Sequence, residues 1–414
     1  MKAEVVNSLD NPRQLEKLYR DDKVSFKREF NSVYPTIKDN TVAQIWYERL
    51  NFENEALSWG SGRELFFVIV ASFVAGLIAK LPTFFAINPE YFYPRNIGFI
   101  VFPFLMAYFA WKQTLPLKII FPVFLIIVAS VIYINVLPNN DKSGTLILAC
   151  IHLPLFLWSI LGFTYVSGDL KNGQGRLNFL RYNGDLVVMT TIILIAGGGL
   201  TVITLGLYEL IGLKIGEFYF QNIAIWGLAA APLVGTYLVQ TNPQLVNMVS
   251  PVVAKIFTPL VFTTLVIYLI AVIYTGKDPY NDREFLLIFN LLLIGVMALI
   301  LFSIAGTAKN SESRILTFML FGLSIVTIVL NGIALSAIVF RISEWGITPN
   351  KLAVLGGNIL ILINLLLVTY RLFKTVNDQN QIETVESSIA SFLPIYSLWT
   401  IVVIFLFPLL FSFK

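Results

Sequence analysis

The chain has 414 residues, of which 57% are hydrophobic and only 13% charged, whereas soluble domains carry about 25% charged residues. Its formal net charge of +4 is spread over the whole length, and no basic block is dense enough to follow a phosphate backbone, so we expect no nucleic-acid partner. One histidine and one cysteine supply neither a zinc cluster nor a Cys-His or Ser-His-Asp set, so we expect no enzyme, no catalytic residue, no metal and no cofactor.

The N-terminal segment, residues 1–62, carries many charges of both signs. Apolar residues at helical spacing between positions 15 and 33 predict one amphipathic helix, which Pro35 ends. Asn40 and Thr41 are candidate caps of a second helix. We predict a cytoplasmic helical hairpin that is too small to be an independent domain, followed by a transmembrane helical domain over residues 63–414.

Apolar runs that match the roughly 20 residues needed to cross a bilayer recur after residue 63. We therefore predict an all-α, polytopic transmembrane bundle of about eleven spans, with membrane lipids around it. The run at 96–111 is short, and Asn242-Pro243 cuts a long uncharged stretch. The predicted spans are 65–87, 96–111, 115–137, 144–166, 185–208, 219–240, 255–275, 285–308, 315–340, 352–370 and 389–413.

Polar residues inside these spans are the best functional pointers, because their burial in lipid is costly. Lys80, late in the first span, is expected to extend to the interface. Asp185 and Glu209 bracket the span with the triplet Gly197–Gly199, which either packs closely against another helix or breaks the helix. His152 is interpreted as a satisfied buried imidazole. Four asparagines either line a polar seam or bond helix to helix: Asn290, Asn331, Asn358 and Asn364.

The turn between the ninth and tenth spans contains the most specific pattern. Arg341 at i−3 is the expected partner of Glu344, whose carboxylate is unfavourable near a helix C-terminus. The turn is either a rigid interfacial connection or a site for a ligand headgroup, an ion or a partner. The candidate binding residues are Arg341, Glu344, Trp345, Gly346, Thr348, Pro349 and Lys351.

This turn resembles the signature of a bacterial, bacteroidete-like family of polytopic membrane proteins of unknown function, with an Arg-x-x-Glu-x-Gly-x-Thr-Pro-Asn-Lys/Arg pattern. Trp345 stands where the family has tyrosine, and Lys351 where it has arginine. The resemblance implies no activity. It implies a multi-pass protein of the bacterial cytoplasmic (inner) membrane, and the excess of basic residues at one set of span ends favours a cytoplasmic N-terminus.

Two functions remain open. The span number, the asparagines and the glycine triplet favour a transporter or permease-like protein for a small solute, ion or lipid. The alternative is a membrane-anchored assembly or regulatory protein that binds a protein partner through residues 1–62.

Overall fold

The computed structural model describes residues 2–9, 11–21, 23–51, 60–140, 142–210, 213–242, 258–267, 269–270, 274, 293–300, 303, 314–377 and 382–413. The chain divides into two compact units, Met1–Trp59 and Gly60–Lys414. Each unit is described by itself below.

The first unit contains four α-helices within its described residues, where two were expected. They are α1 (Lys2–Asn7), α2 (Pro12–Asp21), α3 (Lys23–Val33) and α4 (Thr41–Asn51). As expected, Asn40 caps α4, and its side chain accepts from the backbone N–H of Val42 at 2.8 Å. The predicted single helix over 15–33 is divided between α2 and α3. The apolar residues of these two helices therefore pack against each other as well as against α4. The core comprises Val5, Leu9, Leu15, Phe26, Phe30, Ala43, Trp46 and Leu50.

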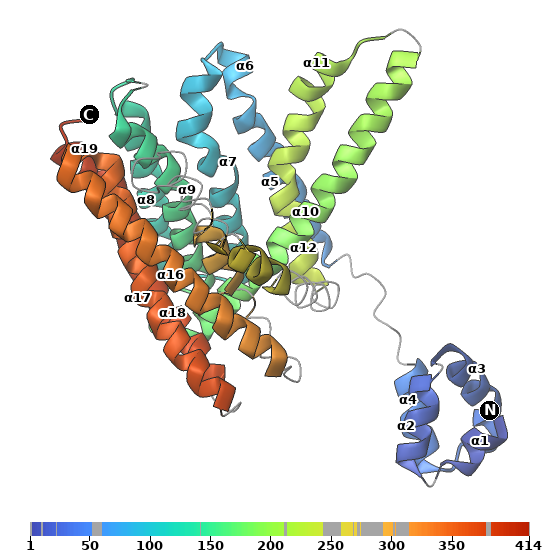
Figure 1. Ribbon diagram of the computed structural model, residues 1–414. Coiled ribbons are helices and arrows are strands. Elements are labelled where there is room, and N and C mark those ends of the chain that lie inside the picture. Colours follow the sequence, from blue (N-terminus) through green and yellow to red (C-terminus); the bar gives the residue numbers. More distant parts are fainter. Residues whose placement is uncertain are drawn as a thin grey trace. The chain divides into compact units, whose positions relative to one another are not determined.

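The second unit is a helical bundle, shown in Figure 1. Eight of its described helical segments are long and apolar enough to cross a membrane, which confirms the all-α polytopic class. Its elements are α5 (Gly62–Ala79), α6 (Leu81–Phe85), α7 (Pro89–Lys112), α8 (Leu117–Val136), α9 (Gly144–Tyr165), α10 (Gly173–Leu210), α11 (Gly216–Tyr219), the π-helix η2 (Phe220–Ala224), α12 (Ile225–Thr241), α16 (Arg314–Trp345), α17 (Pro349–Asn377), α18 (Ile382–Ile401), the π-helix η4 (Val402–Leu406) and α19 (Phe407–Leu410).

The helices differ from the predicted spans at informative places. The short run at 96–111 belongs to α7, which has 24 residues. α12 ends at Thr241, as the Asn242-Pro243 pair predicted. α10 is one helix of 38 residues, so the triplet Gly197–Gly199 does not break it. The triplet does not pack closely against any described part of the chain either, because a Cβ added at any of the three glycines would meet none of its atoms within 4 Å. The spans predicted at 255–275 and 285–308 lie largely outside the described residues.

Two apolar clusters hold the bundle together. The larger lies among α5, α7, α9 and α12, and the second among α16, α17, α18 and neighbouring segments. Because α5 and α7 run antiparallel, the start of α5 meets the end of α7 at one end of the bundle, which we call the Glu64 end. The opposite end, where α5 stops and α7 begins, we call the Lys80 end. Interhelical polar contacts gather at both ends.

Candidate functional site

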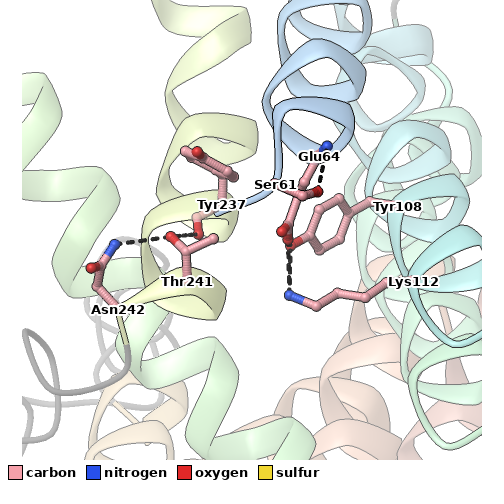
Figure 2. A network of polar contacts seen from close by, with 7 residues as sticks. All are labelled: Ser61, Glu64, Tyr108, Lys112, Tyr237, Thr241 and Asn242. Carbon is pink, nitrogen blue, oxygen red and sulfur yellow. Dashed lines mark hydrogen bonds and ion pairs between the residues drawn. The ribbon is translucent and has the colours of Figure 1, made fainter. Parts of the chain in front are cut away.

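Glu64 begins the most highly connected polar cluster of the bundle (Figure 2). It lies in the first turn of α5, three residues after Ser61, whose hydroxyl accepts from the Glu64 backbone N–H at 3.1 Å. In a capping box the carboxylate at this position turns back to the capping residue. Here it points across to α7 instead. A residue with a ready structural role at the helix start therefore serves an interhelical contact.

Tyr108 and Lys112, one helical turn apart on α7, are the partners of Glu64. The Tyr108 hydroxyl donates to Glu64 Oε1 at 2.5 Å, and Lys112 Nζ donates to the same oxygen at 2.9 Å and to the Tyr108 oxygen at 3.1 Å. Glu64 is 8% exposed and Tyr108 2%, whereas the Lys112 side chain is 32% exposed. The carboxylate and the phenol are thus buried, whereas the lysine that pairs with them is partly exposed.

α12 and the chain entry at Gly60 close the other side of the cluster. Gly60 has φ +58, and a Cβ there would lie 3.1 Å from Glu64 Oε2, 2.9 Å from Thr241 Cγ2 and 3.4 Å from the Tyr237 ring. The Thr241 hydroxyl donates to the Tyr237 carbonyl at 2.7 Å. Only glycine combines this left-handed backbone with so close an approach. The Glu64 cluster therefore lies where α5, α7 and α12 meet.

This arrangement holds a buried carboxylate whose charge one cation, the Lys112 ammonium, compensates. Both Glu64 contacts at Oε1 are charge-assisted or very short, the strong kind of hydrogen bond. An isolated carboxylate in this place would be costly to bury. If Lys112 moved out, Glu64 would need a proton or another cation to replace it, while Tyr108 would still hold the oxygen in place.

Lys80 is the corresponding buried charge at the Lys80 end, and the expectation that it extends to the interface is wrong. It is 3% exposed. Its ammonium donates to the Gln221 carbonyl at 2.8 Å and to Asn222 Oδ1 at 3.2 Å. Both partners belong to the π-helix η2, whose widened turns leave backbone carbonyls available. Lys80 thereby fastens the end of α5 to the segment that leads into α12.

A second polar group at the Lys80 end joins α7 to α8. Asn96 and Asn135 exchange amide hydrogen bonds of 2.9 and 3.0 Å. Arg95, 3% exposed, donates to the Tyr91 carbonyl at 3.2 Å and to Asn139 Oδ1 at 3.1 Å. Its Nε has no hydrogen-bond partner among the described residues.

Arg181 and Glu386 form a buried ion pair between α10 and α18 at the Glu64 end. Arg181 Nη2 lies 2.7 Å from Glu386 Oε1, and the two side chains are 18% and 4% exposed. Both residues lie just before predicted spans, Arg181 before 185–208 and Glu386 before 389–413. The extra helical residues at both span starts bring the pair together.

The predicted turn between α16 and α17 is built mainly from its own caps. Gly346 has φ +75, and Pro349 is the first residue of α17. The backbone N–H of Lys351 donates to Thr348 Oγ1 at 3.4 Å, and its ammonium donates to the carbonyls of Arg341 and Gly346 at 2.9 and 2.8 Å.

The predicted ion pair between Arg341 and Glu344 is wrong, because none joins them in this fully described turn. The Arg341 guanidinium lies 5.3 Å from the ring centroid of Trp345, and Lys351 Nζ lies 5.8 Å from it. Trp345 is 52% exposed, and Glu344 points to the surface as well. A delocalised cation above an indole replaces the expected charge pair.

The predicted intramembrane polar residues that the structure describes make separate contacts. Asp185 is half-buried and Glu209 exposed, 24 positions apart on α10, which is about 36 Å along a helix. The Asn331 amide donates to the Asn358 carbonyl at 3.2 Å.

Asn364 bonds to a neighbouring helix, and His152 bonds within its own helix. Asn364 donates to the Tyr396 hydroxyl at 3.0 Å, so the described asparagines bond α16 to α17 and α17 to α18. Asn290 lies outside the described residues. His152 Nδ1 lies 2.9 Å from the Leu148 carbonyl, as expected for a satisfied imidazole. Within the described ranges, no group of three or more His, Cys, Asp and Glu side chains could hold a metal ion.

The sequence analysis missed the Glu64 cluster, although one signal was available. Tyr108 and Lys112 stand at i and i+4 at the end of an apolar run, a spacing that places both on one helix face. The resemblance of the α16–α17 turn to a bacterial family stays a prediction. No protein-family model, no curated protein and no solved structure matches this chain.

Proposed function

We propose that this chain is a permease-like protein that carries a small solute or ion across the bacterial cytoplasmic membrane, with its N-terminus in the cytoplasm. The Glu64 end would then face the cytoplasm, in keeping with the basic residues that border it. They include Arg63, Lys112, Lys118, Lys171, Arg176, Arg181, Arg371 and Lys374.

The observation that carries this proposal is the Glu64 cluster. A scaffold that only anchors a partner gains little from a buried carboxylate at the junction of three spans, because a paired buried charge stabilises a fold no more than apolar residues of similar size would. Transport gives the group a use, since its pairing with Lys112 can be exchanged for a proton or a substrate cation. Two interrupted segments, the α5–α6 corner and η2, add the broken helices on which transporters build their sites.

The test is uptake by purified protein in proteoliposomes across a panel of solutes, with a pH-sensitive dye inside. We expect one solute to be taken up by the wild type and its uptake to fall by at least about tenfold in Glu64→Gln, which keeps the size of the side chain but cannot carry the charge. Glu90→Gln is the matched control, because Glu90 is exposed in the first turn of α7 at the opposite end. Wild-type vesicles as tight as empty ones for every solute and for protons would refute the proposal.

Tyr108→Phe tests whether the hydrogen bond that positions Glu64 matters apart from the charge of Glu64. It removes the 2.5 Å hydrogen bond and leaves the Glu64 and Lys112 pair in place. We expect a smaller loss of uptake than in Glu64→Gln, with most of the maximal rate retained. Uptake unchanged in Glu64→Gln but lost in Tyr108→Phe would contradict a role for the carboxylate.

The second candidate, an assembly or regulatory role of residues 1–62, is favoured by one observation. Met1–Trp59 is a compact unit with its own core. The aromatic side chains of this unit are buried in that core, with Phe26 and Phe30 0% exposed and Trp46 6%. A partner would therefore have to bind the charged outer faces of the helices. Crosslinking of the full chain and of a chain without residues 1–59 tests this role, and identical partners in both would sink it.

A further inference from the structure

A groove of about 740 Å³ opens at the Lys80 end of the bundle, within the range of about 300–1,000 Å³ typical of ligand sites. One wall is the corner from α6 to α7, and the other is η2 with the start of α12. Figure 1 shows α6 and α11 at this same end. The lining is mostly apolar with a few uncharged polar groups, among them Pro82, Thr83, Asn88, Gln221, Ala224 and Leu228.

Lys80 is not part of the lining, but it lies behind it and joins the two segments that form the walls. It directly precedes α6 on one wall, and its ammonium donates to the Gln221 carbonyl on the other at 2.8 Å. An ammonium has three N–H donors. The second goes to Asn222 Oδ1 at 3.2 Å, and the third has no acceptor among the described residues, with the Phe84 ring centroid 5.9 Å away.

The charge of Lys80 has no carboxylate to balance it in the described part of the bundle. Glu217, one helical turn before Gln221, accepts from the Gln221 side chain at 3.2 Å rather than from Lys80. A cation that is 3% exposed and holds only neutral acceptors is incompletely compensated, because carbonyl dipoles replace its hydration only in part. An anion whose oxygen replaced one of these neutral acceptors would balance the charge.

We propose that this groove binds the headgroup of an anionic phospholipid, with a phosphate oxygen accepting from the Lys80 ammonium and an acyl chain lying along the apolar wall. A lipid fits better than a soluble anion because the walls are mainly apolar and the exposed Phe84 and Phe85 beside the groove suit a lipid surface. Basic pockets between membrane helices bind lipid headgroups in this way. The site stands on its own geometry, whether or not the chain transports a solute.

The entry of the phosphate requires one exchange. Lys80 is buried, so the headgroup reaches its ammonium by replacing the longer hydrogen bond, the one to the exposed Asn222 side chain. The shorter bond to the Gln221 carbonyl can persist. The structure therefore assigns opposite effects to two neighbouring substitutions, Lys80→Met weakening lipid binding and Asn222→Ala strengthening it. A purely structural role of the Lys80 contacts would weaken binding in both.

The experiment measures lipid binding to the full-length protein in detergent micelles by native mass spectrometry, with phosphatidylglycerol, phosphatidylcholine and inorganic phosphate as probes. We expect the wild type to prefer phosphatidylglycerol over phosphatidylcholine by about five- to tenfold, since one lysine near a headgroup contributes about 1 kcal/mol. Lys80→Met should abolish this preference. Lys214→Met, which removes an exposed lysine next to α11, is the matched control and should keep it.

Thr83→Trp keeps the test decisive if Lys80→Met does not fold. Thr83 is exposed and lines the groove, so an indole there fills the space without touching the buried charge. It should lower phosphatidylglycerol binding to the level of phosphatidylcholine. Equal binding of the two lipids by the wild type, an equal loss in Lys214→Met, or binding of inorganic phosphate as tight as that of the lipid would each overturn the proposal.

Discussion

Gly356→Ala tests the packing of α17 on α18 with a change of a single methyl group. A Cβ added at Gly356 would lie 2.1 Å from Trp399 Cη2 and 2.2 Å from Cζ2, whereas carbon atoms in contact stand about 3.5–4.0 Å apart. The indole or a helix must therefore move by about 1.5 Å, and overpacking of this kind costs about 1–3 kcal/mol. The neighbouring Gly357 is the control, because its Cβ would lie 3.9 Å from Trp399 Nε1, an ordinary contact.

Both substitutions gain the same helix propensity, about 1 kcal/mol for alanine over glycine, so their difference isolates the clash. We expect Gly357→Ala to melt at or above the wild-type temperature and Gly356→Ala to be less stable than Gly357→Ala by about 1–3 kcal/mol. Thermal unfolding in detergent, followed by tryptophan fluorescence, measures this difference. Trp399→Leu in the Gly356→Ala background should recover most of it. Equal stability of the two alanine variants would refute the packing of α17 against α18 described above.

Three further outcomes are expected. In the wild type the Glu386 carboxylate lies 2.7 Å from Arg181. Glu386→Gln would leave the Arg181 charge buried without a carboxylate and should lower the free energy of unfolding by about 3–5 kcal/mol; an unchanged denaturation midpoint would contradict this. Gly198→Ala should leave the melting temperature unchanged or slightly raised, since its Cβ meets nothing within 4 Å, and a drop would mean that another helix packs there. The hydrogen bond from Arg20 lowers the pKa of Glu16 in the folded protein. The ionised Glu16 side chain therefore stabilises the fold at pH values above its ordinary pKa of about 4.3, and this stabilisation is lost as the pH falls through the lowered pKa of the folded state. Hydrogen exchange over residues 2–51 should therefore differ between wild type and Glu16→Gln at neutral pH and converge in acid.

Helix positions were predictable where hydropathy alone decides them. The expected spans 115–137 and 144–166 match α8 and α9. The first carries a single charge, Lys118, next to its start, and the second carries none, so hydropathy alone fixes where both end. The start of α7 was missed because Arg95 and Asn96 resemble the end of a span. Asn96 is buried by pairing with Asn135, a partner 39 residues away that no local pattern connects to it.

The ion pairs were beyond prediction for a related reason. Glu64 and Glu386 each lie near the start of a predicted span, where a carboxylate is normally interpreted as interfacial. Whether such a group is buried depends on which helix packs beside it, α7 for Glu64 and α10 for Glu386. Hydrophobic periodicity gives the apolar face of a helix but not its neighbour. The glycine triplet on α10 shows the converse, since a motif typical of close packing faces open space.

α5 connects the two buried charges on which the proposals rest. Glu64 and Lys80 are 16 positions apart, about 24 Å along a helix. One is fastened to α7 and the other to η2, so a shift of α5 against either neighbour must break a charged contact at one end. If transport moves α5 as a rigid element, lipid at the Lys80 end and pairing at the Glu64 end are coupled. Glu64→Gln and Lys80→Met should then have non-additive effects on uptake. Strictly additive effects would mean that α5 is a fixed part of the bundle and that the two ends act independently.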